Sequence, residues 1–153
     1  TVTINNDTKI DDGHIADACE FITEDADSFR ISKETSQTHW KALGLKENNP
    51  GVTLRCYQGS RLVKQIVLLN PKYAIPEQLM SIVLHELGHS LGLNHSCTND
   101  QNIANFASCA SIQKNTEHPY HLAVMFPVLG SQVSKENLRS NDKERASCLY
   151  SGR

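Results

Sequence analysis

The segment His85–His95, here called the histidine segment, constrains the fold more than any other part of the chain, and it reads HELGHSLGLNH. His85 and His89 are four residues apart, so on a helix both side chains project from one face, one turn apart. Gly92 accepts a positive φ at little cost, which lets the chain turn sharply and bring His95 back to the same point. Three imidazoles and a water molecule make an open tetrahedral site, which is typical of catalytic rather than structural zinc.

Glu86 follows the first of these histidines and can hold a water molecule on the metal without being a ligand itself. Zinc lowers the pKa of its water towards neutrality and polarises a carbonyl group, and a glutamate can pass the water's proton to a leaving amine. The alternative is a helix whose histidines only fill a core, but there each imidazole and the carboxylate would need a polar partner. The sequence therefore predicts one catalytic zinc ion held by His85, His89 and His95, with Glu86 as the catalytic general base.

A single helix is expected to carry most of the histidine segment. Apolar residues recur at helical spacing between Leu79 and Leu91. Pro76 suits the first turn of a helix, and Gly92 suits the position just after its end. The pattern therefore predicts a helix that opens at Pro76 and is stopped by Gly92.

The remaining patterns predict an α/β protein in the broad sense, of the α+β kind. Val52–Tyr57 alternates with period two, Gln58–Ser60 is typical of a turn, and Leu62–Leu69 follows as a second strand, which together predict a hairpin. The other expected elements are a strand at Thr1–Asn5, a helix between Asp11 and Ile22, a short strand near Phe29–Ile31, some structure around Trp40–Leu45, a long loop from Asn94 to Thr116 and a final helix from about Ser134 to Leu149.

Size and charge exclude several classes of function. The 153 residues suffice for one domain with a hydrophobic core. The net charge is −2 and both signs are interspersed, so nothing indicates nucleic acid or an anionic membrane as a partner. The longest apolar runs are too short to span a bilayer. We expect a monomeric single domain without a membrane span.

Five cysteines permit either disulfides or buried thiols. Cys97 and Cys109 lie in one polar loop, where a disulfide would contribute about 3 kcal/mol to stability. Cys19, Cys56 and Cys148 are far apart and lie in apolar patterns, so ordinary buried thiols are the alternative for them. At least one of the five thiols must stay unpaired within a monomer. The cysteines favour an exported protein, secreted or periplasmic, in an oxidising location.

With these residues the chain resembles the metzincin clan of zinc peptidases, whose extended motif matches the histidine segment. Val124–Pro127 resembles the Met-turn of that clan, which implies that Met125 is a hydrophobic floor beneath the zinc rather than a ligand. The resemblance implies one metallopeptidase catalytic domain over residues 1–153. Its upper subdomain, to about residue 95, would place a small twisted mixed sheet over the active-site helix. Its lower subdomain would be irregular and end in a helix, with the cleft between the two.

Within the clan the chain is most similar to matrixins. Ser96 directly follows the third histidine, and Pro127 comes two residues after the methionine of the Met-turn, as in that family. The residues that resemble the matrixin C-terminal helix are Leu138, Asp142, Leu149 and Tyr150. This resemblance implies that Asp142 anchors either the Met-turn or the mature N-terminus.

The chain also departs from matrixins. Its segment between His95 and Val124 is much longer, and the upstream part lacks the loop with histidine and aspartate that holds structural zinc and calcium. Pro127 stands where astacin-like and serralysin-like members have a tyrosine ligand. We therefore expect a minimal matrixin-like metzincin with one zinc ion and no clear calcium site.

The resemblance implies that an extended peptide binds along an edge strand by β-augmentation. The expected edge strand consists of Val52, Thr53, Leu54, Arg55, Cys56 and Tyr57. Apolar residues after the Met-turn are expected to line a substrate pocket: Pro127, Val128 and Leu129.

The function expected from these residues is that of a zinc-dependent endopeptidase that hydrolyses peptide bonds of proteins or peptides through a zinc-bound water. Two alternatives stay open. A zinc amidase could use the same chemistry on cell-wall peptides, and a non-catalytic zinc-binding or partner-binding module could keep the fold. Glu86 argues against the module, since loss of this base is the usual way in which such a site is silenced.

Overall fold

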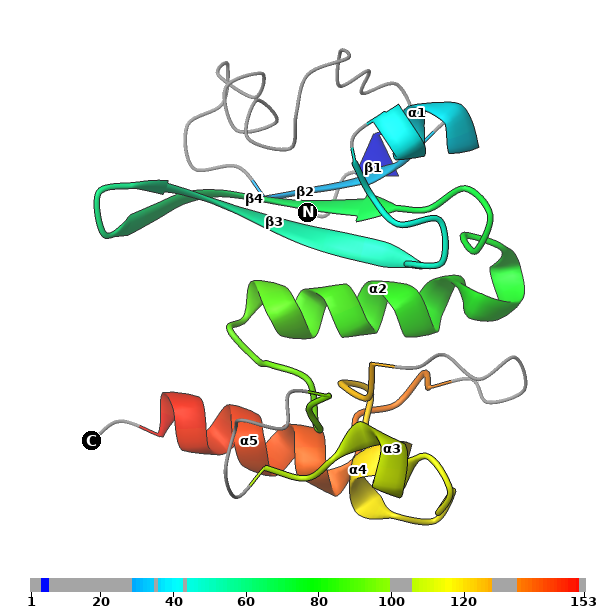
Figure 1. Cartoon of the computed structure of the whole chain (residues 1–153). Helices are drawn as coiled ribbons and strands as arrows, with labels where there is room; N and C mark the ends of the chain where they lie inside the picture. The colour runs from blue at the N-terminus through cyan, green and yellow to red at the C-terminus, as the bar shows by residue number, and fades with distance from the viewer. Residues whose placement is uncertain are drawn as a thin grey trace. The chain divides into compact units, whose positions relative to one another are not determined.

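A computed structural model describes residues 4–5, 29–34, 36–42, 44–99, 106–127 and 135–151 of the chain. The described part folds into mixed α+β structure, as the sequence predicts (Figure 1). Two compact units divide the chain, Thr1–Ser90 and Leu91–Arg153. In these described ranges no helix is both long and apolar enough to cross a membrane.

The first unit contains a small mixed sheet. Its described strands and helices are β1 Ile4–Asn5, β2 Phe29–Lys33, α1 Gln37–Ala42, β3 Gly51–Gln58, β4 Arg61–Leu69 and α2 Pro76–Ser90. The strand order is β1-β2-β4-β3. β1 pairs with β2 and β2 with β4 in parallel, whereas β3 pairs antiparallel with β4. Among the described strands, β3 is therefore the last strand at one edge.

β3 and β4 form the hairpin that the alternating pattern predicts. The turn lies at Gly59 and Ser60, and Gly59 has a φ of 62°. Glycine adopts this left-handed conformation without the steric cost of a Cβ atom. The register shifts between Cys56 and Tyr57, which is a bulge or irregularity close to the turn.

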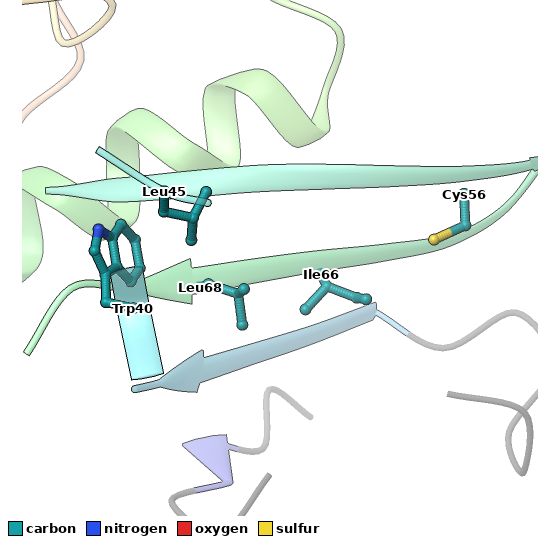
Figure 2. Close-up of a cluster of buried hydrophobic side chains, with 5 residues drawn as sticks. All are labelled: Trp40, Leu45, Cys56, Ile66 and Leu68. Carbon is teal, nitrogen blue, oxygen red and sulfur yellow. The ribbon is translucent and has the colours of Figure 1, made fainter. Parts of the chain in front are cut away.

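The sheet buries side chains on both faces because residues along each strand alternate in direction. On the face near α1, Ile66 and Leu68 of β4 pack with Trp40 and Leu45 in a buried cluster that also contains Cys56 (Figure 2). The indole N–H of Trp40 donates to the carbonyl of Lys46 at 2.9 Å, so its polar atom is satisfied. Helix α2 runs along the opposite face (Figure 1).

Helix α2 begins at Pro76 and ends at Ser90, as predicted. Gly92 has a φ of 89°, which confirms the sharp turn expected after the helix. Ile82 and Glu86 are among its buried residues, whereas Met80 is 53% exposed. The buried side of α2 therefore includes a carboxylate, and this carboxylate needs polar partners within the fold.

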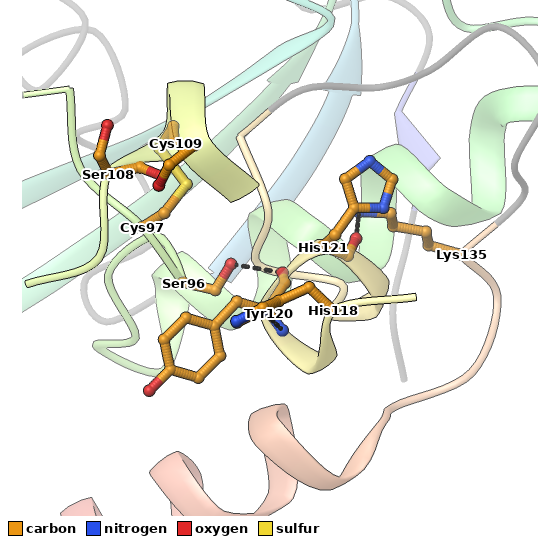
Figure 3. The surroundings of a disulfide bond; sticks show 9 residues. Ser96, Cys97, Ser108, Cys109, His118, Tyr120, His121 and Lys135 are labelled. Atoms are coloured by element: carbon orange, nitrogen blue, oxygen red, sulfur yellow. Dashed lines mark hydrogen bonds between the residues drawn. A yellow bond between two sulfur atoms is a disulfide. The ribbon is translucent and has the colours of Figure 1, made fainter. Parts of the chain in front are cut away.

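The second unit contains three described helices: α3 Cys109–Ile112, α4 Pro119–Leu122 and α5 Ser140–Tyr150. A disulfide joins Cys97 to Cys109 (Figure 3), which is one of the two possibilities that the sequence leaves open for these cysteines. Both residues belong to a buried cluster with Ile112 and Phe126. Cys148 on α5 is an exposed free thiol. The disulfide is compatible with the expectation of export.

Two predictions need correction. The last helix begins at Ser140, not at Ser134, because Asp142 caps the backbone N–H of Arg139 at 3.0 Å and fixes the first turn there. The expected long loop contains the short helix α3, which begins at the disulfide-bonded Cys109. The predicted helix between Asp11 and Ile22 and the first three residues of the predicted strand at Thr1–Asn5 lie outside the described residues.

Candidate metal centre

Three histidines of the histidine segment come together in the structure. One ring nitrogen from each of His85, His89 and His95 lies within 4.8 Å of the other two. The rings of His85 and His89 lie edge to face, with centroids 4.8 Å apart. Three imidazole nitrogens are a common donor set for zinc. The cluster is compatible with a metal ion.

The end of α2 that carries His89 is attached to the sheet by two side chains. Arg55 of β3 donates to the carbonyl of His89, and Gln65 of β4 donates to the carbonyl of Ser90 at 2.6 Å. Arg55 and Gln65 are direct partners in the antiparallel register. The last carbonyls of a helix lack partners within the helix, so these two side chains act as a C-terminal cap.

His95 follows a loop that is fixed within the second unit. The hydroxyl of Tyr150 at the end of α5 donates to the carbonyl of Leu91. After the loop, the N–H of Ser96 donates to the carbonyl of Met125 at 2.9 Å. The backbone is therefore bonded on both sides of His95, which limits the positions that its imidazole can take.

Glu86 is buried against β3. The hydroxyl of Thr53 lies 2.6 Å from Oε2 of Glu86 and 3.0 Å from its carbonyl oxygen. Only 5% of Glu86 is exposed. Burial raises the pKa of the Glu86 carboxyl to about 7, and the hydrogen bond with Thr53 acts in the opposite direction. A cation on the neighbouring histidines would favour the ionised form, so such a carboxyl is suited to accept a proton and return it.

The turn that contains Met125 is fully buried and is held by Asp142. The two carboxylate oxygens of Asp142 accept hydrogen bonds from the N–H of Val124 at 2.9 Å and of Met125 at 3.2 Å. This confirms that Asp142 anchors the segment that resembles a Met-turn. The place of Met125 beneath a metal stays a prediction.

Lys135 holds the carbonyl groups before the same turn. Its ammonium group donates to the carbonyl of His121 at 2.6 Å (Figure 3). It also donates to the carbonyl of Ala123 at 2.9 Å and lies 4.7 Å from the centre of the Phe126 ring. Burial lowers the pKa of Lys135 to about 8, and the charge of Asp142 acts in the opposite direction. No sequence pattern indicated a role for Lys135, because it lies at the start of a stretch that was predicted to be a helix.

The predicted substrate residues are only partly described. Val52–Tyr57 lies within β3, at the edge of the described sheet, and the side chains of Thr53 and Arg55 bond to α2. Pro127 is half-buried, while Val128 and Leu129 lie outside the described residues. The roles of the edge strand and of the pocket stay predictions. Alternation along β3 could have indicated that Thr53 and Arg55 share a face.

Comparison of the chain with protein-family models, with curated proteins and with solved structures finds no match. Any function must therefore be argued from the residues of the candidate metal centre themselves.

Proposed function

We propose that this chain is a zinc-dependent endopeptidase of the metzincin type. The observation that carries the proposal is the meeting of three histidine nitrogens within 4.8 Å of one another, in a segment whose Glu86 is buried and hydrogen-bonded. A site of three imidazoles leaves a fourth position for water or substrate, as catalytic zinc requires. A buried glutamate next to a ligand provides the base that such chemistry needs.

The donor set favours zinc over magnesium and calcium. His85, His89 and His95 offer nitrogen ligands, whereas magnesium and calcium prefer sites built from oxygen atoms. A zinc ion in this position would acidify a water molecule and polarise the carbonyl group of the scissile bond. Arg55 and Gln65, which cap the end of α2, would help to keep His89 in position.

The chemical steps fall to Glu86. Its carboxylate takes a proton from the attacking water, whose oxygen bonds to the carbonyl carbon of the peptide. The protonated carboxyl then gives this proton to the amide nitrogen while the C–N bond breaks. One water molecule is consumed, and a carboxylic acid and an amine are formed; at neutral pH the proton of the acid passes to the amine, which gives a carboxylate and an ammonium group. The carboxyl returns to its starting state without a covalent intermediate.

Substrate recognition is assigned to β3 and to the residues after Met125. β3 is the last strand in the described sheet order, and an extended peptide could add to it by main-chain hydrogen bonds. Pro127, Val128 and Leu129 would offer apolar contacts to the side chain after the cleaved bond. The apolar character of these residues would favour an apolar side chain at this position of the substrate.

Digestion of a denatured protein tests the proposed function. Mass spectrometry of the products should identify new termini inside the substrate, since an endopeptidase cuts internal bonds. A chelator should abolish the cleavage, and added zinc should restore it. Zinc binding without cleavage of any protein would contradict the proposal, and cleavage of cell-wall peptides alone would then favour the amidase.

A further inference from the structure

Gly51 and Thr53 of β3 lie against the carboxylate of Glu86, and we call this pair of residues the carboxylate seat. The hydroxyl of Thr53 lies 2.6 Å from Oε2 of Glu86. A Cβ atom added to Gly51 would lie 2.9 Å from both Cγ and Oε1 of Glu86. Gly51 and Thr53 are two residues apart on one strand, so both face α2. The carboxylate therefore lies against a residue without a side chain at Gly51 and against a hydroxyl group at Thr53.

The hydroxyl of Thr53 has one hydrogen to donate, and two oxygens of Glu86 compete for it. The carboxylate oxygen is nearer, at 2.6 Å, than the carbonyl oxygen, at 3.0 Å. A short bond is expected where the acceptor is charged. The hydrogen bond therefore fixes Oε2 and leaves Oε1 as the oxygen that can exchange a proton with water or with an amine.

The rest of the structure keeps Thr53 in place. Thr53 is paired with Val67, a fully buried residue of β4. Its β-branched side chain has few accessible rotamers, so the hydroxyl loses little freedom when it bonds to Glu86. Two residues further along the strand, Arg55 bonds to the carbonyl of His89. The same face of β3 thus contacts α2 both at the proposed base and at a proposed ligand.

We propose that Gly51 and Thr53 are positioning residues, which orient the carboxylate of Glu86 so that Oε1 performs the proton transfers. This inference rests on the proposed function, because it assigns the seat a role in the same hydrolysis. A general base acts only within hydrogen-bond reach of the proton that it takes. A carboxylate that rotates away from that position lowers the rate of the chemical step but leaves substrate binding and metal binding intact.

Kinetics of four variants test the proposal. Thr53→Val keeps the shape of the side chain but removes the hydrogen bond, and it should lower kcat about 10- to 100-fold with unchanged KM and zinc content. Thr53→Ser restores the hydroxyl and should restore most of kcat. Gly51→Ala should also lower kcat, because the new Cβ displaces the carboxylate. Ser111→Ala is the control, since the exposed Ser111 hydroxyl in the second unit donates to the carbonyl of Ser108 at 2.8 Å and not to Glu86; its kcat should not change.

A double variant separates positioning from general damage to the fold. If Thr53 acts through Glu86, Thr53→Val should cause no further loss of activity in a Glu86→Ala background. Wild-type kcat in Thr53→Val, or an equal loss with and without Glu86, would overturn the inference while the proposed function stands. Absence of peptide cleavage by the wild type would instead refute the proposed function and remove the positioning role with it. A double-mutant cycle of Thr53→Val and Glu86→Gln on unfolding then still reports whether the two side chains interact.

Discussion

The carboxylate of Asp142 accepts a hydrogen bond from the backbone N–H of Met125 at 3.2 Å, and both residues are almost completely buried. The same carboxylate also accepts from the N–H groups of Val124 at 2.9 Å and Arg139 at 3.0 Å. One side chain therefore joins the Met125 turn to the first turn of α5. Without it, three backbone donors would lose their partner.

Replacement of Asp142 should strongly destabilise the second unit. An unsatisfied buried N–H costs about 1–3 kcal/mol, and the bonds from Val124 and Met125 are both buried, so Asp142→Ala should lower the free energy of unfolding by at least about 2 kcal/mol. Asp142→Asn keeps one acceptor oxygen, and its free energy of unfolding should lie between those of the wild type and of Asp142→Ala. Denaturant unfolding followed by circular dichroism measures the difference. The exposed Glu144→Ala on the same helix is the control, and an Asp142→Ala protein as stable as this control would contradict the prediction.

Zinc should stabilise the wild-type chain through its three histidines. A ligand that binds only the folded state raises the melting temperature, and at 100 times its Kd it adds about 2.7 kcal/mol. His89→Ala should lose this zinc-dependent shift, measured by differential scanning fluorimetry with and without zinc. His118→Ala is the control, because the His118 imidazole instead accepts a hydrogen bond from the N–H of Tyr120. A shift in His89→Ala equal to that of the wild type would contradict the assignment of this ligand.

The cap at the end of α2 should influence metal affinity without contact to the metal. Arg55→Ala removes the donor to the carbonyl of His89 and should weaken zinc binding about 10- to 100-fold. Gln65→Ala removes the adjacent donor to Ser90 and should act in the same direction. Competition with a chromogenic chelator measures the affinities. The exposed Arg61→Ala in the same hairpin should bind zinc as the wild type does, and equal affinity in all four proteins would show that the cap has no such role.

Lys135 should make the free energy of unfolding depend on pH in the alkaline range. Its pKa is lowered to about 8 in the folded chain, against 10.5 as the ordinary value. Between these values the unfolded chain still binds the proton that the folded chain has released, so stability should rise with pH across this window. Below pH 8 both states are protonated, and this contribution no longer varies. Measurement of the free energy of unfolding of the wild type and of Lys135→Met from pH 7 to 10 isolates the effect of Lys135. A difference in free energy between the two proteins that does not change with pH would contradict the prediction.

Local patterns predicted the elements around the candidate metal centre well. Pro76 and Gly92 delimit α2 because the limits of this helix depend on their own backbone preferences. The β3–β4 hairpin follows from alternation and from a glycine in the turn. The meeting of the three histidines also follows from one short segment, since a helical turn and one sharp bend suffice.

Contacts between distant parts of the chain were not predictable in the same way. The bond between Thr53 and Glu86 joins residues 33 positions apart and depends on the packing of β3 on α2. The start of α5 depends on Asp142, whose carboxylate is shared between Arg139 and the Met125 turn. The burial of Lys135 likewise depends on carbonyls presented by another segment. Periodicity contains no information on such partners, because it describes only which face of an element is apolar.

The most direct test of the central claim compares Glu86→Ala with the wild type in zinc content and in peptide-bond cleavage of a denatured protein. Glu86→Ala should keep the zinc content of the wild type and lose about 10²- to 10⁴-fold in kcat, since only the base is removed. Glu117→Ala, which removes an exposed glutamate elsewhere, should match the wild type in both measurements. Full cleavage by zinc-loaded Glu86→Ala would contradict the assignment of the base. A wild-type protein that binds zinc but cuts no protein would contradict the endopeptidase itself.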